Sequence, residues 1–441
     1  MKGQFAILRQ RTFRHLFLAQ AVSWLGTAIA PVALAFAILG RPGGTATDLG
    51  LVEACAAGAL VASLLAGGVL ADRFARYRVM VVSDLVAFAA QGAIAALFIS
   101  RTAPLGLVAA LAAIGGAAGG VSYPCLRGLV PQVVDGPQVQ SANALIQLAQ
   151  NSTRLLGASV SGILVVGVGA GWGLAFDSLT FLLSAALVLT SGAPRTSPVP
   201  SAKADADADP DAAEAAPKPA TILSDLRDGW REVRSRQWLW VCIAEFTIVN
   251  LCWSPSVQVL GPVVARQHYG GALAWSVLVT AQAIGLVGGS LLAMRLRPAF
   301  PLLFATLITF AFLPPFFLLA FHAPVWLTAI SMLGIGVAID VYEVLWVTTM
   351  QENIPPDKIS RVASWDALGA FVLGPVGLVI VGPVASVLGT EGTLIGAGGL
   401  VLLSTLGALG TPSVRRLPAR PKPAGGGEAA AETPGPVPSS A

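Results

Sequence analysis

The sequence has few charged residues for its length. Asp, Glu, Lys and Arg together make up only 11% of its 441 residues, whereas apolar side chains make up 55%. A soluble globular domain carries about 25% charged residues, so this balance argues against a soluble protein. We therefore expect most of the chain to lie in a lipid bilayer.

Cysteine and histidine are also scarce, with four and three residues respectively. The cysteines fall in apolar stretches and form no C-x-x-C pair, so neither a disulfide framework nor a metal site is expected. The histidines are far apart in the sequence and are expected at helix ends or in loops. In chain order these residues are His15, Cys55, Cys125, Cys242, Cys252, His268 and His322.

Motifs for nucleotide-driven or enzymatic chemistry are missing. The chain contains no G-x-x-x-x-G-K-[ST] loop and no soluble segment large enough to hydrolyse ATP, which excludes a primary pump. It also lacks a nucleophile elbow and a zinc-protease motif, so we expect neither an enzyme nor a cofactor. The slight excess of Lys and Arg is explained by membrane topology, and no nucleic-acid partner is expected.

The sequence does contain long apolar stretches, separated by proline, glycine or charge. A spanning helix needs about 20 apolar residues, and twelve stretches are long enough. They are 14–40, 48–71, 79–100, 104–127, 140–168, 171–191, 238–265, 271–294, 299–321, 325–349, 360–388 and 392–411. We therefore predict an all-α integral membrane protein with twelve transmembrane helices.

Basic residues predict the orientation, because they collect in short cytoplasmic loops. Most of them precede the first span or lie in loops after even-numbered spans, which all fall on one side of the membrane. Few lie on the opposite side. This predicts a multi-pass protein of the cell membrane with both termini in the cytoplasm. The positions that carry the argument are Arg9, Arg11, Arg14, Arg73, Arg76, Arg78, Arg295, Arg297, Lys358 and Arg361, against Arg41, Arg101 and Arg266.

The composition changes at two places and divides the chain into four parts. Residues 193–220 are rich in Pro, Ala and alternating Asp, which predicts a flexible linker. The following residues to 237 are amphipathic and predict a helix at the membrane surface. We expect a six-helix bundle over 1–192, this linker over 193–237, a second bundle over 238–411 and a disordered tail over 412–441.

The segment GVLADRFARYR joins the second and third stretches and carries Gly68, Asp72, Arg73, Arg76 and Arg78. Its charges are too costly to bury in hydrocarbon and must lie in a tight turn at the water face. The segment resembles the loop G-x-x-x-D-R-x-G-R-x-R of the major facilitator superfamily, with alanine at the second glycine. The resemblance implies a cytoplasmic gate that latches the two halves of the fold together. A positively charged turn without a gating role is the alternative.

Other segments extend this resemblance over residues 11–410. RLLGASVSGIL and GWGLAFDSLTFLLSAALVL resemble the superfamily branch of macrolide-efflux and enterobactin-exporter-like proteins. The family fold consists of two six-helix bundles whose first, fourth, seventh and tenth helices line a central cavity. The resemblance also implies a monomer whose partners are a small-molecule substrate, protons and the lipid bilayer.

Ionisable residues inside the stretches are functional candidates, because burying them is expensive. Asp340 and Glu343 are three residues apart and lie on one helical face, which favours protonation or cation recognition there; a helix cap or a salt bridge is the alternative. Glu245 could add polar lining to the cavity, and Glu53 is either interfacial or part of an outer gate. Arg154 needs a counter-charge, which Glu53, Glu245 or a span-ten acid could supply.

Five aromatic residues fall on the expected cavity helices and could contact a flat or amphipathic ligand. They are Trp24, Phe36, Trp253, Tyr342 and Trp346. Together these features predict a secondary transporter that exports an amphipathic small molecule, a drug-like natural product or a siderophore, by proton antiport. An importer or uniporter of the same fold, and a non-transporting membrane sensor, remain as alternatives.

Overall fold

The computed structural model is helical throughout the residues that it describes, and no strand occurs among them. These residues are 4–134, 138–192, 230–355 and 373–418, together with positions 358, 362, 365, 366 and 369. The expected linker up to residue 229 and the tail beyond residue 418 lie outside them. Of the expected surface helix, residues 230–235 are described and are helical.

The first half of the chain forms six long helices after a short 3-10 turn, η1 (Gln4–Arg9). They are α1 (Arg11–Gly40), α2 (Ala46–Arg73), α3 (Arg76–Ile99), α4 (Leu105–Val133), α5 (Val139–Gly167) and α6 (Ala170–Thr190). Local signals set their ends. At the start of α2, for example, Thr45 and Asp48 form a capping box that satisfies free backbone N–H groups.

The second half contains more interrupted helices. They are α8 (Gln237–Pro255), the π-helical η4 (Ser256–Leu260), α9 (Gly261–His268), α10 (Ala272–Ala293), α11 (Pro301–Ile308), the 3-10 turn η5 (Thr309–Phe312), α12 (Leu313–Ala320), α13 (Val325–Asn353), α15 (Leu373–Gly410) and α16 (Pro412–Arg415). Prolines accompany these irregular turns, because proline lacks the N–H that a regular helix needs. Helices α8, η4 and α9 still form one rod of 32 residues.

Ten helices of the described chain are long and apolar enough to cross a membrane. Helix α5 is not among them, but it has 29 residues and packs beside α1. Helix α15 counts once although it consists of two legs, because Gly389 breaks it with a φ of 76°. That value is readily adopted by glycine, and the break falls between the last two predicted stretches. These two features account for the twelve expected passes.

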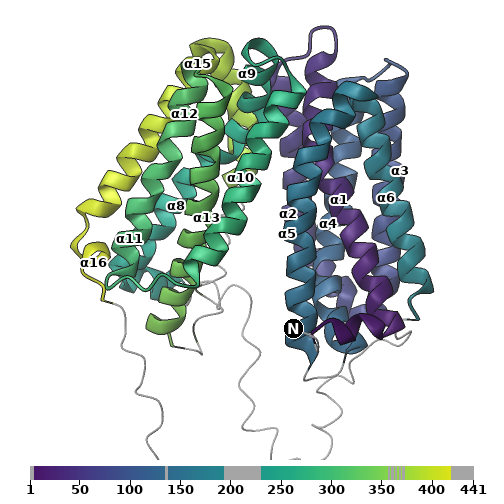
Figure 1. Cartoon of the computed structure of the whole chain (residues 1–441), viewed down its shortest axis with the longest axis horizontal. Helices are drawn as coiled ribbons and strands as arrows, with labels where there is room; N and C mark the ends of the chain where they lie inside the picture. Colours follow the sequence, from purple (N-terminus) through teal and green to yellow (C-terminus); the bar gives the residue numbers. More distant parts are fainter. Residues whose placement is uncertain are drawn as a thin grey trace, which may run out of the picture.

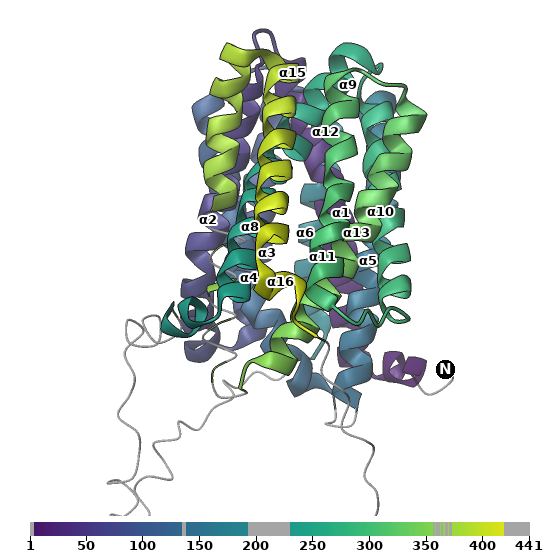
Figure 2. The same cartoon turned by 90° about the vertical axis from the view of Figure 1, so that its left-hand side faces the viewer.

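The helices form two bundles that stand side by side (Figure 1). The N-terminal segment, the end of α6 and the start of α8 lie at one end, which we call the linker end; the opposite end is the far end. Figure 2 shows the two legs of α15 descending from a turn at the far end. The arrangement confirms the predicted fold class.

The hydrophobic cores show how the bundles are joined. One cluster of buried residues contains side chains of both bundles and lies at the far end, with members such as Leu39 and Val263. Two further clusters lie at the linker end, and each belongs to one bundle alone, around Leu129 in the first and Met350 in the second. The bundles therefore share a core at the far end and have separate cores at the linker end.

Candidate functional site

Glycines bring α2 and α15 into close contact at the far end. A Cβ atom on Gly50 would lie 2.4 Å from the carbonyl oxygen of Leu378, and one on Gly382 would lie 2.3 Å from the Cα atom of Thr47. Side chains larger than hydrogen do not fit at either position without a backbone shift. The crossing therefore depends on glycine.

Helices α5 and α10 make the second contact between the bundles. The hydroxyl groups of Ser161 and Ser276 are 2.9 Å apart and buried, and Thr280 donates to Ser159 at 3.3 Å. A Cβ atom on Gly162 would lie 2.5 Å from the hydroxyl oxygen of Ser276. Together with the α2–α15 crossing, this contact seals the far end, and we call the two crossings the far-end seal.

One face of α5 is polar along its whole length. Asn143, Gln147, Arg154 and Ser161 are spaced by four and seven residues, which places them on one helical face. Ser161 faces α10, so the other three lie on the same face nearer to the linker end, where all three side chains are exposed. These polar residues explain why α5 falls short of the hydropathy of a typical spanning helix.

Arg154 has no ion pair or hydrogen bond to any residue of the described chain. The sequence predicts a counter-charge from Glu53, Glu245 or a span-ten acid, and the structure brings none of these into contact with the guanidinium group. Glu53 is half-buried on α2, and Glu245 is buried in the other bundle. The polar face of α5 thus presents an exposed cation at the level where the bundles separate.

The charged segment after α2 is held within the first bundle. Arg76 donates from Nη1 to the carbonyl oxygen of Gly128 on α4, at 2.6 Å, and Arg78 donates to the hydroxyl of Tyr77. Arg73 is exposed. The side chains of Gly68 and Asp72 lie outside the described part of the structure. Among the described residues, these arginines form no hydrogen bond or ion pair with the second bundle, and the gating role stays a prediction.

Asp340 and Glu343 lie on α13 but have different surroundings. Asp340 is half-buried and accepts a hydrogen bond from Ser290 on α10. Glu343 is exposed, and its charged neighbours are Asp366 and Asp340. The two side chains do not hydrogen-bond to each other. Asp340 is thus engaged in a contact with α10, whereas Glu343, on the same face of α13, is exposed.

Glu245 is the most unusual acid of the second bundle. Its side chain is 3% exposed, and neither carboxylate oxygen has a hydrogen-bond partner within the described residues. The hydroxyl of Thr405 on α15 faces this carboxylate, but no hydrogen bond of normal length and angle joins the two groups. Glu245 also lines a small cavity, with room for about one water molecule, together with Phe246, Thr309 and Tyr342. An ionised carboxylate without a partner is costly to bury.

The first bundle buries two acids, Asp84 and Asp177. Ser184 donates to Asp84 at 2.7 Å, which joins α6 to α3. Asp177 on α6 is 2% exposed, and its Oδ1 atom lies against Gly26 of α1. The acid-free first span thus faces an acid from α6. The glycine at position 26 is the sequence signal for this close approach.

Most of the five aromatic candidates are buried and pack against other aromatic side chains. Trp253 is buried edge-on against Phe312 and Phe316 in the shared core. Tyr342 stacks on Phe246 with ring centroids 5.2 Å apart. Of the remaining three, Trp346 is also buried and Trp24 and Phe36 are half-buried.

Trp346 donates from its indole N–H to Asp366 at 3.2 Å. The same ring lies edge-on to Trp238, with centroids 6.1 Å apart. Three of the five aromatic candidates thus pack within the second bundle, and contact of any of the five with a ligand stays a prediction. Helix position alone does not tell which face of the helix a residue occupies.

Two bundles of long apolar helices that share a core at one end are an architecture found in many membrane transporters. A model of the Major Facilitator Superfamily matches residues 16–378. The chain therefore belongs to this superfamily, which confirms the resemblance seen in its sequence.

Known proteins similar to this chain include an exporter. The chain is 26% identical over 419 residues to the enterobactin exporter EntS of Escherichia coli O1:K1, covering 89% of this chain and 91% of the relative. It is 24% identical over 312 residues to the uncharacterized MFS-type transporter YvqJ of Bacillus subtilis, covering 69% and 70%. The crystal structure of the nucleoside transporter NupG superposes with a TM-score of 0.69 at 11% identity, over 90% of this chain and 98% of that chain.

Proposed function

We propose that this transporter exports an amphipathic small molecule, a natural product or siderophore, in exchange for protons. The observation that carries the proposal is the polar face of α5, on which Arg154 is exposed and has no hydrogen bond or ion pair to a described residue. The similarity to an enterobactin exporter supports the outward direction. We place the linker end, with its basic residues, in the cytoplasm.

Arg154 is the proposed recognition group for the substrate. A guanidinium group binds carboxylate, phenolate or phosphate oxygens through two parallel hydrogen bonds. Because its charge is not neutralised by a described side chain, an anionic group of the substrate would supply the missing partner. The exposed Asn143 and Gln147 on the same face would hydrogen-bond to the polar part of the molecule.

Glu245 is the proposed proton carrier. A proton would relieve the cost of its buried, unpartnered carboxylate, whereas Asp340 already has a donor in Ser290 and the side chain of Glu343 is exposed. Loss of the proton to the linker end would require the surroundings of Glu245 to rearrange. That requirement would couple proton release to the movement of the second bundle. Asp340 and Glu343 remain secondary candidates.

The test is accumulation of a panel of fluorescent dyes, macrolides and catecholate compounds in an efflux-deficient bacterial host. Expression of the chain should lower accumulation of at least one compound, and a protonophore should abolish the effect. Arg154→Gln should abolish export of anionic compounds, whereas Arg154→Lys should retain part of it. No effect on any compound, with the protein present in the membrane, would contradict the proposed export.

Glu245→Gln tests the coupling separately, and Glu343→Gln tests the secondary candidate on α13. We expect Glu245→Gln to lose net export but to retain exchange of labelled for unlabelled substrate, because glutamine resembles the protonated acid. Unchanged net export by Glu245→Gln would refute the role of this residue. Loss of export in Glu343→Gln alone would move the coupling to α13.

A further inference from the structure

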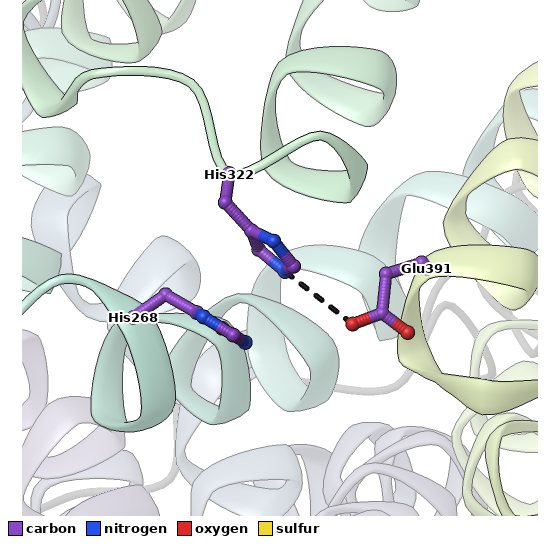
Figure 3. Close-up of side chains that lie close together, drawn as sticks. All are labelled: His268, His322 and Glu391. Atoms are coloured by element: carbon purple, nitrogen blue, oxygen red, sulfur yellow. Dashed lines mark ion pairs between the residues drawn. The ribbon is translucent and has the colours of Figure 1, made fainter.

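Two of the three histidines meet at the far end of the second bundle. His268 ends α9, His322 lies in the turn after α12, and Glu391 follows the Gly389 break in α15. Figure 3 shows the three side chains converging from these separate segments. Their ligand atoms all lie within 4.8 Å of one another. Two histidines that are 54 positions apart in the sequence thus lie together in space, at the helix ends and turns where the sequence predicts them.

The geometry of this cluster leaves donor atoms free. The Nε2 atom of His322 is 3.3 Å from the Oε1 atom of Glu391, yet it makes no hydrogen bond within the described chain. The imidazole rings of His268 and His322 are stacked, with centroids 3.6 Å apart and planes inclined by 21°. The cluster thus contains a buried nitrogen directed at a carboxylate and a second imidazole beside it.

The backbone also holds His322 in an uncommon conformation. Its φ is 50°, in the left-handed region that non-glycine residues seldom occupy, whereas the turn that leads to Glu391 uses Gly389, which adopts its φ of 76° readily. Backbone strain of this kind costs on the order of 1 kcal/mol or more and is concentrated at functional sites. The turn after α12 therefore directs His322 toward α15 at an energetic cost.

We propose that His268, His322 and Glu391 bind a first-row divalent transition-metal ion of the Zn²⁺ type. Two imidazole nitrogens and one carboxylate oxygen are a ligand set of zinc sites that keep a position for water. Ligands 2.0–2.1 Å from a tetrahedral ion are separated by about 3.3 Å, which matches the distance between His322 Nε2 and Glu391 Oε1. Calcium and magnesium prefer oxygen ligands and do not suit this set.

Metal binding requires one adjustment. The ring of His268 must turn out of the stacked position so that its nitrogen points at the ion. The residue is exposed at the end of α9, so this rotation is sterically open. The bound ion would then tie together the tips of α9, α12 and α15, next to the shared core that closes the far end. This inference is independent of the substrate and of the direction of transport.

The test is a titration of the purified full-length protein, with its affinity tag removed, with Zn²⁺ at pH 7.5 against a competing chelator dye. We expect one bound ion per chain, without competition from Ca²⁺. His268→Asn, His322→Asn and Glu391→Gln should each weaken binding at least about tenfold. His15→Asn is the matched control, because it removes the chain's remaining histidine at the opposite end, and its binding should equal that of wild type.

X-ray absorption at the zinc edge of the wild-type complex provides a second readout that needs no variant to fold. The spectrum should show two imidazole ligands and one or more oxygen ligands. Acidification should release the ion, because the histidines must be neutral to bind it. Absence of saturable binding, equal weakening by His15→Asn, or a shell without imidazole would each overturn the proposed site.

Discussion

Gly50→Ala tests whether the far-end seal belongs to one state of a transport cycle. The added Cβ atom would lie 2.4 Å from the carbonyl oxygen of Leu378, whereas ordinary contacts of a Cβ atom begin near 3.4 Å. Helices α2 and α15 must therefore separate by about 1 Å, and overpacking of this size costs about 1–3 kcal/mol. The cost arises only where the bundles touch, so it destabilises the state that is sealed at the far end.

The matched control is Gly58→Ala on the same helix. Its Cβ atom would meet the Cβ atom of Pro375 at 4.0 Å, an ordinary contact. Both substitutions change helix propensity equally, by about 1 kcal/mol, so this contribution cancels in the comparison. A penalty of 1–3 kcal/mol corresponds to a shift in the population of the two states of about 5- to 150-fold.

Pulsed electron spin resonance measures this shift. In a background without the four native cysteines, spin labels at Phe74 and Met294, both exposed near the linker end, report the separation of the bundles there. Gly50→Ala should transfer population to a shorter distance as the linker end closes, and Gly58→Ala should resemble wild type. A wild-type distribution for Gly50→Ala, with the protein folded, would refute the assignment of this crossing to one state.

Two further predictions concern stability. Gly26→Ala should lower the unfolding temperature, because its Cβ atom would lie 2.1 Å from the hydroxyl of Thr180; Gly396→Ala, with no atom within 4 Å, is the control, and equal effects would contradict the reasoning. Desolvation raises the pKa of Glu232. The hydrogen bonds and charges of Arg236 and Lys358 together lower it by more, so the pKa lies below its usual 4.5. Near neutral pH, Glu232→Gln should therefore reduce the free energy of unfolding by at most about 1 kcal/mol. The unfolding temperature should fall slightly. The difference should begin to shrink below pH 4.5, where the carboxylate protonates in the unfolded chain, and should vanish once the pH falls below the lowered pKa of the folded protein. A difference that persists in more acidic solution would contradict the ion pair.

Much of the fold can be predicted from the sequence, because the bilayer requires long apolar helices. The expected stretches agree with the observed helices to within a few residues where both are described, and the break at Gly389 lies between the last two stretches. Glycine and proline also mark the interruptions of the second half. These features depend on local sequence, so single-sequence patterns are sufficient for them.

The surroundings of individual side chains are less predictable. The sequence gives no sign that Trp253 packs against Phe316, or that His268 stacks on His322, because these contacts join residues more than 50 positions apart. The burial of Glu245 without a partner likewise depends on α15, far along the chain. A helical pattern identifies the residues of one face, but the neighbour of that face is set by tertiary packing.

The most direct test of the proposed function is transport by the purified protein in liposomes with a known orientation. With the far-end compartment made acidic, the account predicts that substrate accumulates there against its gradient while protons move the opposite way. Glu245→Gln should abolish this accumulation. Substrate movement that ignores the pH gradient, or accumulation on the alkaline side, would contradict proton-driven export.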